Sequence, residues 1–418
     1  MNAARKLLAG LLDAGLAALA TFLAGVIAVR LLDTRSLAVY AVLFSATVLG
    51  MLLPRQLHYV PAQLAANLEP DLRAPLLRSD LLRAVPVSAG TFLVVLASGL
   101  TLLGTAPLPV CLALGVTGAA YAAVSPFQDH VRAALHLVDR HYSAAACSVV
   151  LALVVGGGAV AVLVAPRSPL DLLAPFGLLL LGNLISVALG TVLLRGAPSH
   201  RAYRPQPFGD RARLLLSEAA VQGAWFACNY AVLILLGAAA LAHLETARIL
   251  ASPLTILATA LVTFMGPAVL RRLRPTPANP HGARNDIVRI LATLVVGGAV
   301  YLAVLAVLRG PVGAVLAKSV DLGLTAARLG EVVVEGASTI VTLVVFALGR
   351  TRETLAISVT AGVTGLAATI ALAPVLGLYA LPVGQAIGMA VRLVIAWTSV
   401  GRVTRAALAD PQALPVIS

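Results

Sequence analysis

Apolar stretches of about 20 residues recur along the whole chain, and this feature restricts the possible folds more than any other. About 20 consecutive apolar residues suffice for one helix to cross the hydrocarbon core of a bilayer. The stretches show no alternation of apolar and polar residues, which disfavours a β-barrel. We therefore predict an all-α polytopic membrane protein with twelve transmembrane helices. The predicted spans lie at about 8–32, 36–54, 84–104, 106–126, 143–165, 171–194, 215–236, 246–269, 287–308, 329–349, 354–374 and 378–400.

The composition excludes an ordinary soluble domain, because 60% of the 418 residues are apolar and only 11% are charged. The formal net charge is +13. Twenty-two Lys and Arg residues fall in loops on the side of the N-terminus and six in the opposite loops. Basic residues gather in cytoplasmic loops, so we predict that both termini are cytoplasmic in a multi-pass protein of the inner (cytoplasmic) membrane. Basic residues spread over every inner loop argue against nucleic-acid binding.

The chain divides into two halves that look related. Segment 139–148 aligns without gaps on segment 349–358 and shares Arg, Ala and Ser with it at an offset of 210 positions. Pro54 and Pro267 are related by an offset of 213 positions. Such repeats in secondary transporters enclose a central cavity. We predict an N-terminal six-helix half at 1–194, a cytoplasmic linker at 195–214, a C-terminal six-helix half at 215–405 and a cytoplasmic tail at 406–418.

Several short motifs resemble one transporter superfamily. In segment 242–253, Arg248 stands five residues before Pro253, and Met265-Gly266-Pro267 follows. Leu348-Gly349-Arg350 and the segment 376–388 add to the similarity. The sequence resembles the multidrug/oligosaccharidyl-lipid/polysaccharide exporter (MATE/MOP) superfamily, in particular its Wzx-type oligosaccharide flippases and lipid II flippases. The resemblance implies a transporter, not an enzyme, that flips a polyprenyl-pyrophosphate-linked oligosaccharide for surface polysaccharide biosynthesis by ion-coupled alternating access.

The resemblance assigns Arg248 to a cationic cavity that receives the lipid-linked pyrophosphate. Glu245 lies three residues earlier on the same helix face, where it can hold the guanidinium group for bidentate phosphate binding. A structural ion pair near the outer interface is the alternative. Three neutral polar residues, Gln222, Asn229 and Gln385, complete the predicted pyrophosphate and sugar cavity. The alternative for these three is that they bridge packed helices.

Two acidic residues are the predicted ion-coupling groups. Asp13 and Glu218 each lie within about two turns of the start of the first helix of a half. Charges inside spans are costly and often mark ion pathways, so we predict that these carboxylates bind H⁺ or Na⁺ during the transport cycle. The alternative is an acid that favours the N-terminus of its helix and pairs with Arg5 or Arg213.

The other charged residues near span ends have plainer interpretations. Arg328, Glu331 and Glu335 share one helix face, and we predict a solvated helix entrance there, with an outer cation site as the alternative. Arg392 lies close to the inner end of its span, and we predict that it extends toward the interface.

No motif indicates catalysis or a cofactor. The sequence contains no Gly-x-x-x-x-Gly-Lys, no His-Glu-x-x-His and no Gly-x-Ser-x-Gly, so we predict no catalytic residue and no cofactor. His130, His136 and His141 share a predicted cytoplasmic loop, but their spacing fits no metal-ligand pattern on a helix face. We therefore predict no metal site.

Two other functions remain open. A MATE-type drug/cation antiporter would need an aromatic-rich cavity, and only 5% of the residues are aromatic. A membrane-embedded glycan polymerase or ligase would need a long outer loop, and the longest, at about 309–328, has around 20 residues. The expected partners are the lipid-linked oligosaccharide, H⁺ or Na⁺, bilayer lipids and other glycan-assembly membrane proteins, without nucleic acid.

Overall fold

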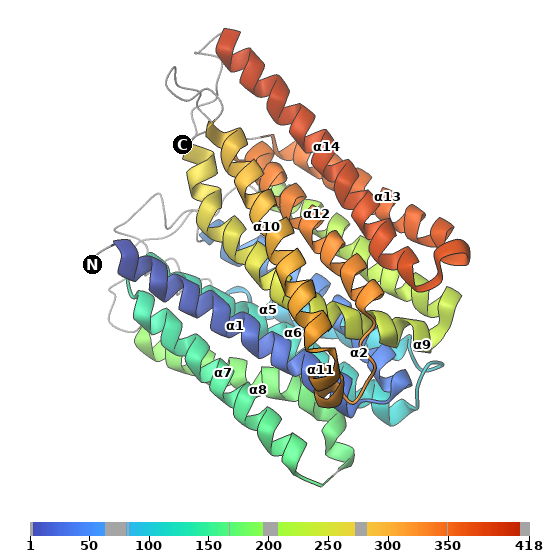
Figure 1. The fold of residues 1–418 in the computed structure, drawn as a ribbon. Coiled ribbons are helices and arrows are strands. Elements are labelled where there is room, and N and C mark those ends of the chain that lie inside the picture. The colour runs from blue at the N-terminus through green and yellow to red at the C-terminus, as the bar shows by residue number, and fades with distance from the viewer. Residues whose placement is uncertain are drawn as a thin grey trace. The chain divides into compact units, whose positions relative to one another are not determined.

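The computed structural model describes residues 3–62, 81, 83–166, 168–194, 208–271, 282–348 and 350–409, and the elements found there are all helical (Figure 1). In these residues, nine helical segments are long and apolar enough to cross a membrane. The protein is therefore an all-α, multi-pass membrane protein. Two of the nine segments, Leu215–Leu261 and Thr351–Arg402, are longer than one crossing requires. The total of twelve crossings stays a prediction.

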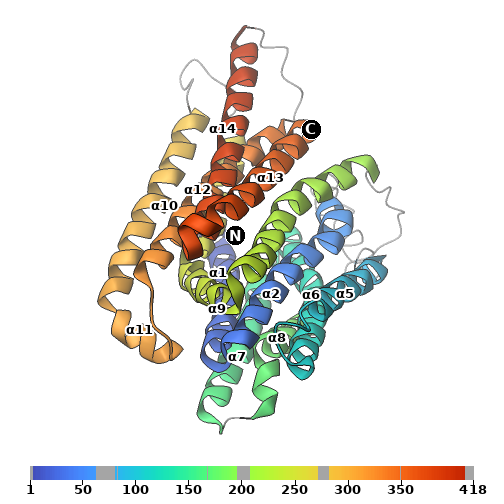
Figure 2. The same cartoon turned by 90° about the vertical axis from the view of Figure 1, so that its right-hand side faces the viewer.

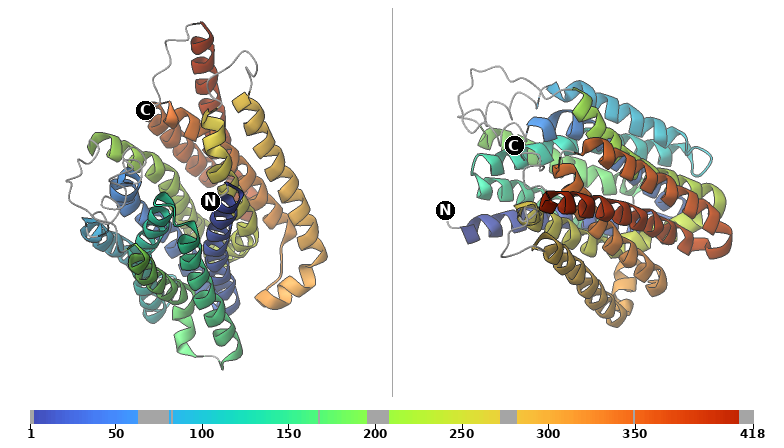
Figure 3. Two further views of the ribbon diagram at one scale, coloured as in Figure 1. Left: turned by 90° about the vertical axis from the view of Figure 1, so that its left-hand side faces the viewer. Right: turned by 90° about the horizontal axis from the view of Figure 1, so that it is seen from above.

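The chain separates into two compact units, Met1–Leu215 (unit 1) and Leu216–Ser418 (unit 2). In unit 1, α6 packs against α2, α5 and α8, while α1 packs against α7 and α8. Figure 3 shows the neighbouring helices α7 and α8 from two further sides. The elements are α1 (Ala3–Leu31), α2 (Thr34–Pro54), the π-helical turn η1 (Arg55–Tyr59), α5 (Val85–Leu100), α6 (Leu108–Leu137), α7 (His141–Val164), the 3₁₀ turn η3 (Pro169–Leu173) and α8 (Ala174–Leu193).

Local sequence explains how helices of unit 1 begin and pack. Asp33 caps α2, because its carboxylate accepts a hydrogen bond of 2.8 Å from the backbone N–H of Ser36. Tyr40 of α2 packs its ring 4.8 Å from the ring of Phe176 in α8, and both side chains are buried. Aromatic pairs at this distance stabilise a core beyond the area they bury.

In unit 2, α14 packs against α12 and α13, and α10 packs against α12 (Figure 2). Residues of several of these helices, including Leu254, Ile290, Val341, Ile357 and Ala396, form one apolar core. The elements are α9 (Phe208–Arg271, which begins in unit 1), α10 (Gly282–Val307), α11 (Arg309–Leu316), α12 (Leu322–Ala347), α13 (Thr351–Leu376), the 3₁₀ turn η4 (Gly377–Tyr379) and α14 (Ala380–Ala409).

Glycines bring α13 and α14 into close contact. A Cβ atom on Gly388 would lie 2.6 Å from the carbonyl oxygen of Ala361, and one on Gly384 would lie 2.6 Å from the backbone nitrogen of Thr369. Neither backbone could give way without shifting its helix. The Gly384-x-x-x-Gly388 pattern therefore acts as a helix-packing face, as small residues do between membrane helices.

The helix α9 breaks at one residue, Gly237, with φ 86° and ψ 174°. Only glycine adopts this backbone conformation without strain, so the residue alone separates a first arm, 208–236, from a second arm, 238–271. The prediction of a loop at 237–245 was wrong, because the second arm is already helical at residue 238. The apolar residues 238–242 fit a helix as well as a loop.

Other segments that we predicted as loops are also helical, among them parts of the loops at 127–142 and 309–328. Residues 127–137 continue α6 to Leu137, and residues 322–328 form the first two turns of α12. Polar residues lower the apolar character of both segments, which is why a hydropathy window excludes them. Packing against neighbouring helices overrides this local signal. Helix α12 begins where the carboxylate of Asp321 accepts a hydrogen bond from the backbone N–H of Leu324.

Candidate functional site

Asp13 is the centre of a buried polar cluster in unit 1. Arg132 donates two hydrogen bonds to its carboxylate, from Nε to Oδ1 and from Nη2 to Oδ2, each of 2.8 Å. The Nε2 atom of His136 lies 2.9 Å from Oδ2, and the hydroxyl of Ser148 donates to Oδ1 at 2.6 Å. One carboxylate that is 4% exposed thus joins α1, α6 and α7.

This cluster differs from the expected environment of Asp13. The alternative partner proposed for it, Arg5, has a side chain outside the described set, and Arg132 takes the position of the counter-charge. Arg132 and His136 were predicted to lie in a loop, so sequence reasoning missed them. The signal that could have found them is their spacing of four residues, which places two polar side chains on one helix face.

The geometry satisfies the carboxylate of Asp13. A buried carboxylate without partners is very costly, and two fork-shaped bonds from a guanidinium group with two further polar contacts offset that cost. A change in the charge of Asp13 would leave Arg132, whose side chain is only 12% exposed, with the exposed Asp129 as its remaining counter-ion. The cluster therefore couples the charge of one group to the packing of three helices.

In unit 2, Arg248 and Glu245 form the ion pair expected from their spacing. Arg248 donates from Nε to Oε2 at 2.8 Å and from Nη2 to Oε1 at 2.6 Å. Its guanidinium carbon lies 6.0 Å from the ring centroid of Trp225 in the first arm of α9, at the limit of a cation–π contact. Trp225 and Arg248 stand 12 and 11 residues from Gly237, so the two arms bring them together. The role of this pair in substrate binding stays a prediction.

A second set of charges in unit 2 is more buried than we predicted. Arg328 is 3% exposed and donates from Nη1 to Glu331 at 2.6 Å, so a solvated helix entrance is wrong for this pair. Arg392 is 4% exposed and does not extend to an interface. Glu335 interacts electrostatically with Arg392 of α14 and with Glu218 of α9.

These charges form one region with the Arg248–Glu245 pair. Glu331 interacts electrostatically with both Arg328 and Arg248, which links α12 to the second arm of α9. Among the described residues, the Nε atoms of Arg328 and Arg392 have no hydrogen-bond partner although both are buried. Such groups can donate to an anion that enters the region.

The neutral polar residues of the predicted cavity fall in the same unit. Asn229 and Gln385 are each 4% exposed, and Gln222 is half-buried in the first arm of α9. Within the described part of the chain, the Nε2 atom of Gln385 has no hydrogen-bond partner. Gln385 and Thr369 face the thiol of Cys228, beside Asn229. Their contact with a substrate stays a prediction.

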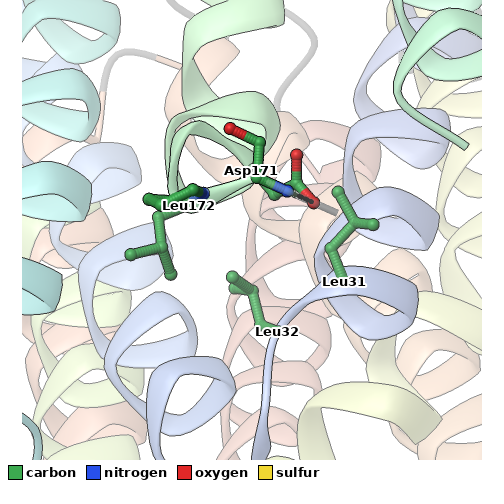
Figure 4. Close-up of a pocket in the computed structure, with 6 residues that line it drawn as sticks. Leu31, Leu32, Asp171 and Leu172 are labelled. Atoms are coloured by element: carbon green, nitrogen blue, oxygen red, sulfur yellow. Dashed lines mark hydrogen bonds between the residues drawn. The ribbon is translucent and has the colours of Figure 1, made fainter. Parts of the chain in front are cut away.

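A small pocket opens between the end of α1 and η3 in unit 1 (Figure 4). It has a volume of about 310 Å³ and is lined by Leu31, Leu32, Ser168, Pro169, Asp171 and Leu172. Asp171 accepts a hydrogen bond of 3.3 Å from the backbone N–H of Ser168, as in a capping box. The acid thus serves the start of η3, and the pocket offers no convergent set of polar groups.

The described residues contain no group of three or more His, Cys, Asp or Glu side chains that could hold a metal ion. The three cysteines, Cys111, Cys147 and Cys228, are buried and free.

Neither a protein-family model nor a curated protein matches this sequence. Solved structures, in contrast, match nearly the whole chain. An inward-facing multidrug resistance MATE family transporter of the MOP superfamily superposes with a TM-score of 0.69 at 14% identity, over 94% of this chain and 96% of the other. The chain has the fold of the MATE/MOP superfamily. An outward-facing multidrug MATE transporter gives a TM-score of 0.65 at 12% identity, over 97% and 96% of the two chains.

A third solved structure of the MATE/MOP superfamily has a similar fold. A MOP superfamily transporter from Pyrococcus furiosus, whose binding pocket is described as having reversed polarity that suggests a different function, matches with a TM-score of 0.67 at 12% identity. The match covers 97% of this chain and 96% of that one. At these identities the likeness establishes the fold, and the Wzx branch stays a prediction.

Proposed function

We propose that this protein is a secondary transporter that flips a polyprenyl-pyrophosphate-linked oligosaccharide across the cytoplasmic membrane, for surface polysaccharide biosynthesis. The MATE/MOP fold supports transport by alternating access. The single observation that supports an anionic substrate is the arginine set of unit 2, the buried Arg328 and Arg392 with the partly buried Arg248. Guanidinium groups inside apolar spans are costly and are retained where they serve a substrate or a partner.

In this proposal, Arg248 receives the pyrophosphate. Its guanidinium group already makes a two-bond contact with Glu245, which is the geometry that a phosphate would also use. Phosphate oxygens would compete with Glu245 for the donors of Arg248, and Trp225 would pack against the sugars. Arg328 and Arg392, whose Nε atoms have no hydrogen-bond partner among the described residues, would supply further donors.

Ion coupling is assigned to Asp13 in unit 1 and Glu218 in unit 2. Asp13 holds three helices of its unit together, so a proton on its carboxylate would loosen their packing. Glu218 interacts with Arg392 and Glu335, so a proton or Na⁺ there would change the charge near the pyrophosphate site. The gradient then biases the population of the two states of the cycle.

The test is export of surface glycan by cells that carry an Arg248→Ala variant. We expect export to be lost while the protein still inserts at the normal level. Arg248→Lys is the matched control, because lysine keeps the charge but not the two-bond geometry, and we expect a partial loss. Normal export by Arg248→Ala would contradict the proposed site. Neighbouring glycosyltransferase genes would independently favour glycan export.

The proposed topology has twelve crossings with both termini in the cytoplasm. Single cysteines placed in the exposed turns of a variant without Cys111, Cys147 and Cys228 test it by labelling from either side of the membrane. The turn at 139–140 is expected to react only from the cytoplasmic side. Labelling from outside would reverse the orientation.

A drug/cation antiporter is the second candidate. The carboxylates Glu218, Glu245, Glu331 and Glu335 all lie in unit 2, and acidic residues attract organic cations. Solved proteins with this fold include multidrug transporters. Resistance of expressing cells to cationic drugs, without any change in surface glycan, would favour this function over the first.

A further inference from the structure

A chain of titratable groups runs through the turn between α6 and α7 of unit 1. The Nε2 atom of His141 lies 3.3 Å from Oδ1 of Asp139, and its Nδ1 atom lies 3.0 Å from Nδ1 of His136. The Nε2 atom of His136 lies 2.9 Å from Oδ2 of Asp13. The side chain of Asp139 is 64% exposed and that of Asp13 is 6% exposed. The chain thus connects a solvent-facing carboxylate to the buried centre of the cluster.

The backbone of the turn sets this arrangement. Asp139 has a φ of 62°, a left-handed conformation that aspartate and asparagine adopt more readily than most residues. The backbone N–H of Arg140 closes the turn by donating 2.8 Å to the carbonyl of Leu135. His136 in the last turn of α6 and His141 at the start of α7 are thereby brought together, with ring centroids 5.3 Å apart.

The contacts of His136 and His141 require more protons than two neutral imidazole rings carry. A carboxylate only accepts hydrogen bonds, so each of the two Nε2 atoms must carry a proton. The two Nδ1 atoms are in contact and need one proton between them. The contacts therefore require three protons on two rings, whereas two neutral imidazoles carry only two. The complete chain exists only when the pair holds one extra proton.

The surrounding charges favour this state. Two acids face the pair directly, Asp13 from α1 and Asp139 from the turn. Arg132 and Asp129 of α6 form an ion pair of 3.3 Å. Arg140 donates to the carbonyl of Leu193 in α8, and α7 adds no charged group near Asp13 among its described residues, where the thiol of Cys147 and the hydroxyl of Ser148 lie. Among these described groups, three carboxylates face two guanidinium groups, so one imidazolium charge brings the set to neutrality.

We propose that His136 and His141 form a single proton-binding site, through which a proton passes between Asp139 at the exposed turn and Asp13 inside unit 1. The step breaks the N–H bond at His141 Nδ1 and forms one at His136 Nδ1. His136 then holds protons on both nitrogens and can pass the proton on Nε2 to Oδ2 of Asp13. Both rings are then neutral, with the proton of His141 on Nε2 and that of His136 on Nδ1, and each ring must move this proton to its other nitrogen before a new proton can bind Nε2 of His141 from the side of Asp139.

The consequence follows from the contacts of Asp13. A protonated carboxyl group carries no charge for Arg132, so the contact between α1 and α6 weakens when the proton arrives. Histidine changes its charge between about pH 5 and pH 8, which suits a group that loads and unloads protons in a cell. The route to Asp13 specifies how ions couple to transport in the proposed function, and it rests on that function. The existence of the proton site on His136 and His141 does not rest on it.

The direct test is nitrogen NMR of the full chain with ¹⁵N-labelled histidine, in lipid nanodiscs. A proton shared by two ring nitrogens gives a coupling between the two ¹⁵N nuclei across the hydrogen bond. We expect this coupling between the Nδ1 atoms of His136 and His141, and its loss in His136→Gln and His141→Gln. Asp139→Asn keeps the left-handed turn but removes one carboxylate that faces the pair, so we expect the coupling to appear only at lower pH than in the wild type. A wild-type protein without the coupling at every pH from about 5 to 8 would overturn the proposal.

A functional measurement tests the route. We expect that glycan export by wild-type cells depends on the pH gradient across the membrane, and that this dependence is lost in His141→Gln. An unchanged dependence in His141→Gln would overturn the route. If the wild type exports glycan with no dependence on the gradient, proton coupling fails as part of the proposed function, and the nitrogen coupling alone then decides whether the proton site exists.

Discussion

The turn between α6 and α7 and the turn between α12 and α13 join helices with equivalent boundaries but carry different side-chain chemistry. Helix α6 ends at Leu137 and α12 at Ala347, while α7 begins at His141 and α13 at Thr351, so both boundaries are 210 positions apart. The residue before each second helix has nearly the same conformation. It has φ −95° and ψ 52° at Arg140, and φ −85° and ψ 53° at Arg350.

The side chains around the two turns are not alike. Ser148 of α7 donates to Asp13 at 2.6 Å, whereas Ser358, 210 positions later, meets the hydroxyl of Ser217 at 2.9 Å. Thr342 and Phe346 stand 210 positions after Arg132 and His136. Equivalent helix boundaries therefore form in unit 2 without a cluster like that of Asp13. The need to connect two helices does not explain why unit 1 contains the Asp13 cluster. This difference favours a functional role for the cluster.

The largest effect in this comparison is expected from Asp13→Ala. The substitution leaves Arg132 with only the exposed carboxylate of Asp129 as a counter-ion, and breaking a buried pair costs about 3 kcal/mol of the free energy of unfolding. Ser217→Ala, the matched change in unit 2, removes one neutral hydrogen bond and is expected to cost about 0.5 kcal/mol. Denaturant unfolding in mixed micelles measures both. Equal losses would mean that the two positions are energetically equivalent.

The next largest difference in stability is expected between substitutions of one glycine in each unit. In Gly388→Ala of unit 2, the new Cβ atom would meet backbone atoms of α13, including the carbonyl oxygen of Ala361 at 2.6 Å. Overpacking against backbone is expected to cost about 2 kcal/mol. In Gly158→Ala of unit 1 it would meet the flexible tip of Leu178, and we expect a loss below about 1 kcal/mol. The midpoint of thermal unfolding compares them, and a larger loss for Gly158→Ala would be contrary to this packing argument.

The paired serines allow a finer comparison. Ser148→Ala removes a hydrogen bond to a carboxylate, and we expect a loss of about 1.5 kcal/mol in the free energy of unfolding. Ser358→Ala removes a hydrogen bond between two hydroxyls, for which about 0.5 kcal/mol is expected. The double variant should show additive losses, because the two sites lie in different units. A larger loss for Ser358→Ala than for Ser148→Ala would show that the charge of Asp13 does not determine the difference between the two serines.

The smallest effect is expected at the start of α13. Glu353 accepts from Ser399 at 2.6 Å and pairs with Arg350 at 2.8 Å and Arg402 at 3.3 Å. These arginine side chains are 41% and 63% exposed, so solvent screens the pairs. We expect Glu353→Gln to change the free energy of unfolding by less than about 1 kcal/mol. A loss as large as that of Asp13→Ala would show that this turn also depends on a charged centre.

Much of the helical architecture could be predicted from the sequence, because apolar runs and membrane-crossing helices obey one length rule. The offset of 210 positions between the two halves could also be predicted, from three shared residues near Arg140 and Arg350. The same offset relates the end of α6 to that of α12 and the start of α7 to that of α13. The pair Arg248 and Glu245 was predicted from its spacing and is present. These features depend on neighbours along the chain.

The Asp13 cluster could not be predicted, because its members are far apart in sequence. Arg132 and Ser148 stand 119 and 135 positions after Asp13, and no local pattern links them. The sequence suggested that Glu218 corresponds to Asp13, whereas Ser217 makes the corresponding contact with the aligned serine. The burial of Arg328 and Arg392 was missed for the same reason, since hydropathy near a helix end cannot reveal which helices pack around it.

The break at Gly237 has a mechanical consequence for unit 2. Gly237 is the residue with non-helical φ and ψ between the two arms of α9, so a change in its backbone angles changes the angle between the arms. Trp225 and Arg248 lie on opposite arms, 12 and 11 residues from this glycine. The distance of 6.0 Å between the guanidinium carbon of Arg248 and the ring centroid of Trp225 therefore depends on the angle at Gly237. A ligand that binds either side chain acts on this angle.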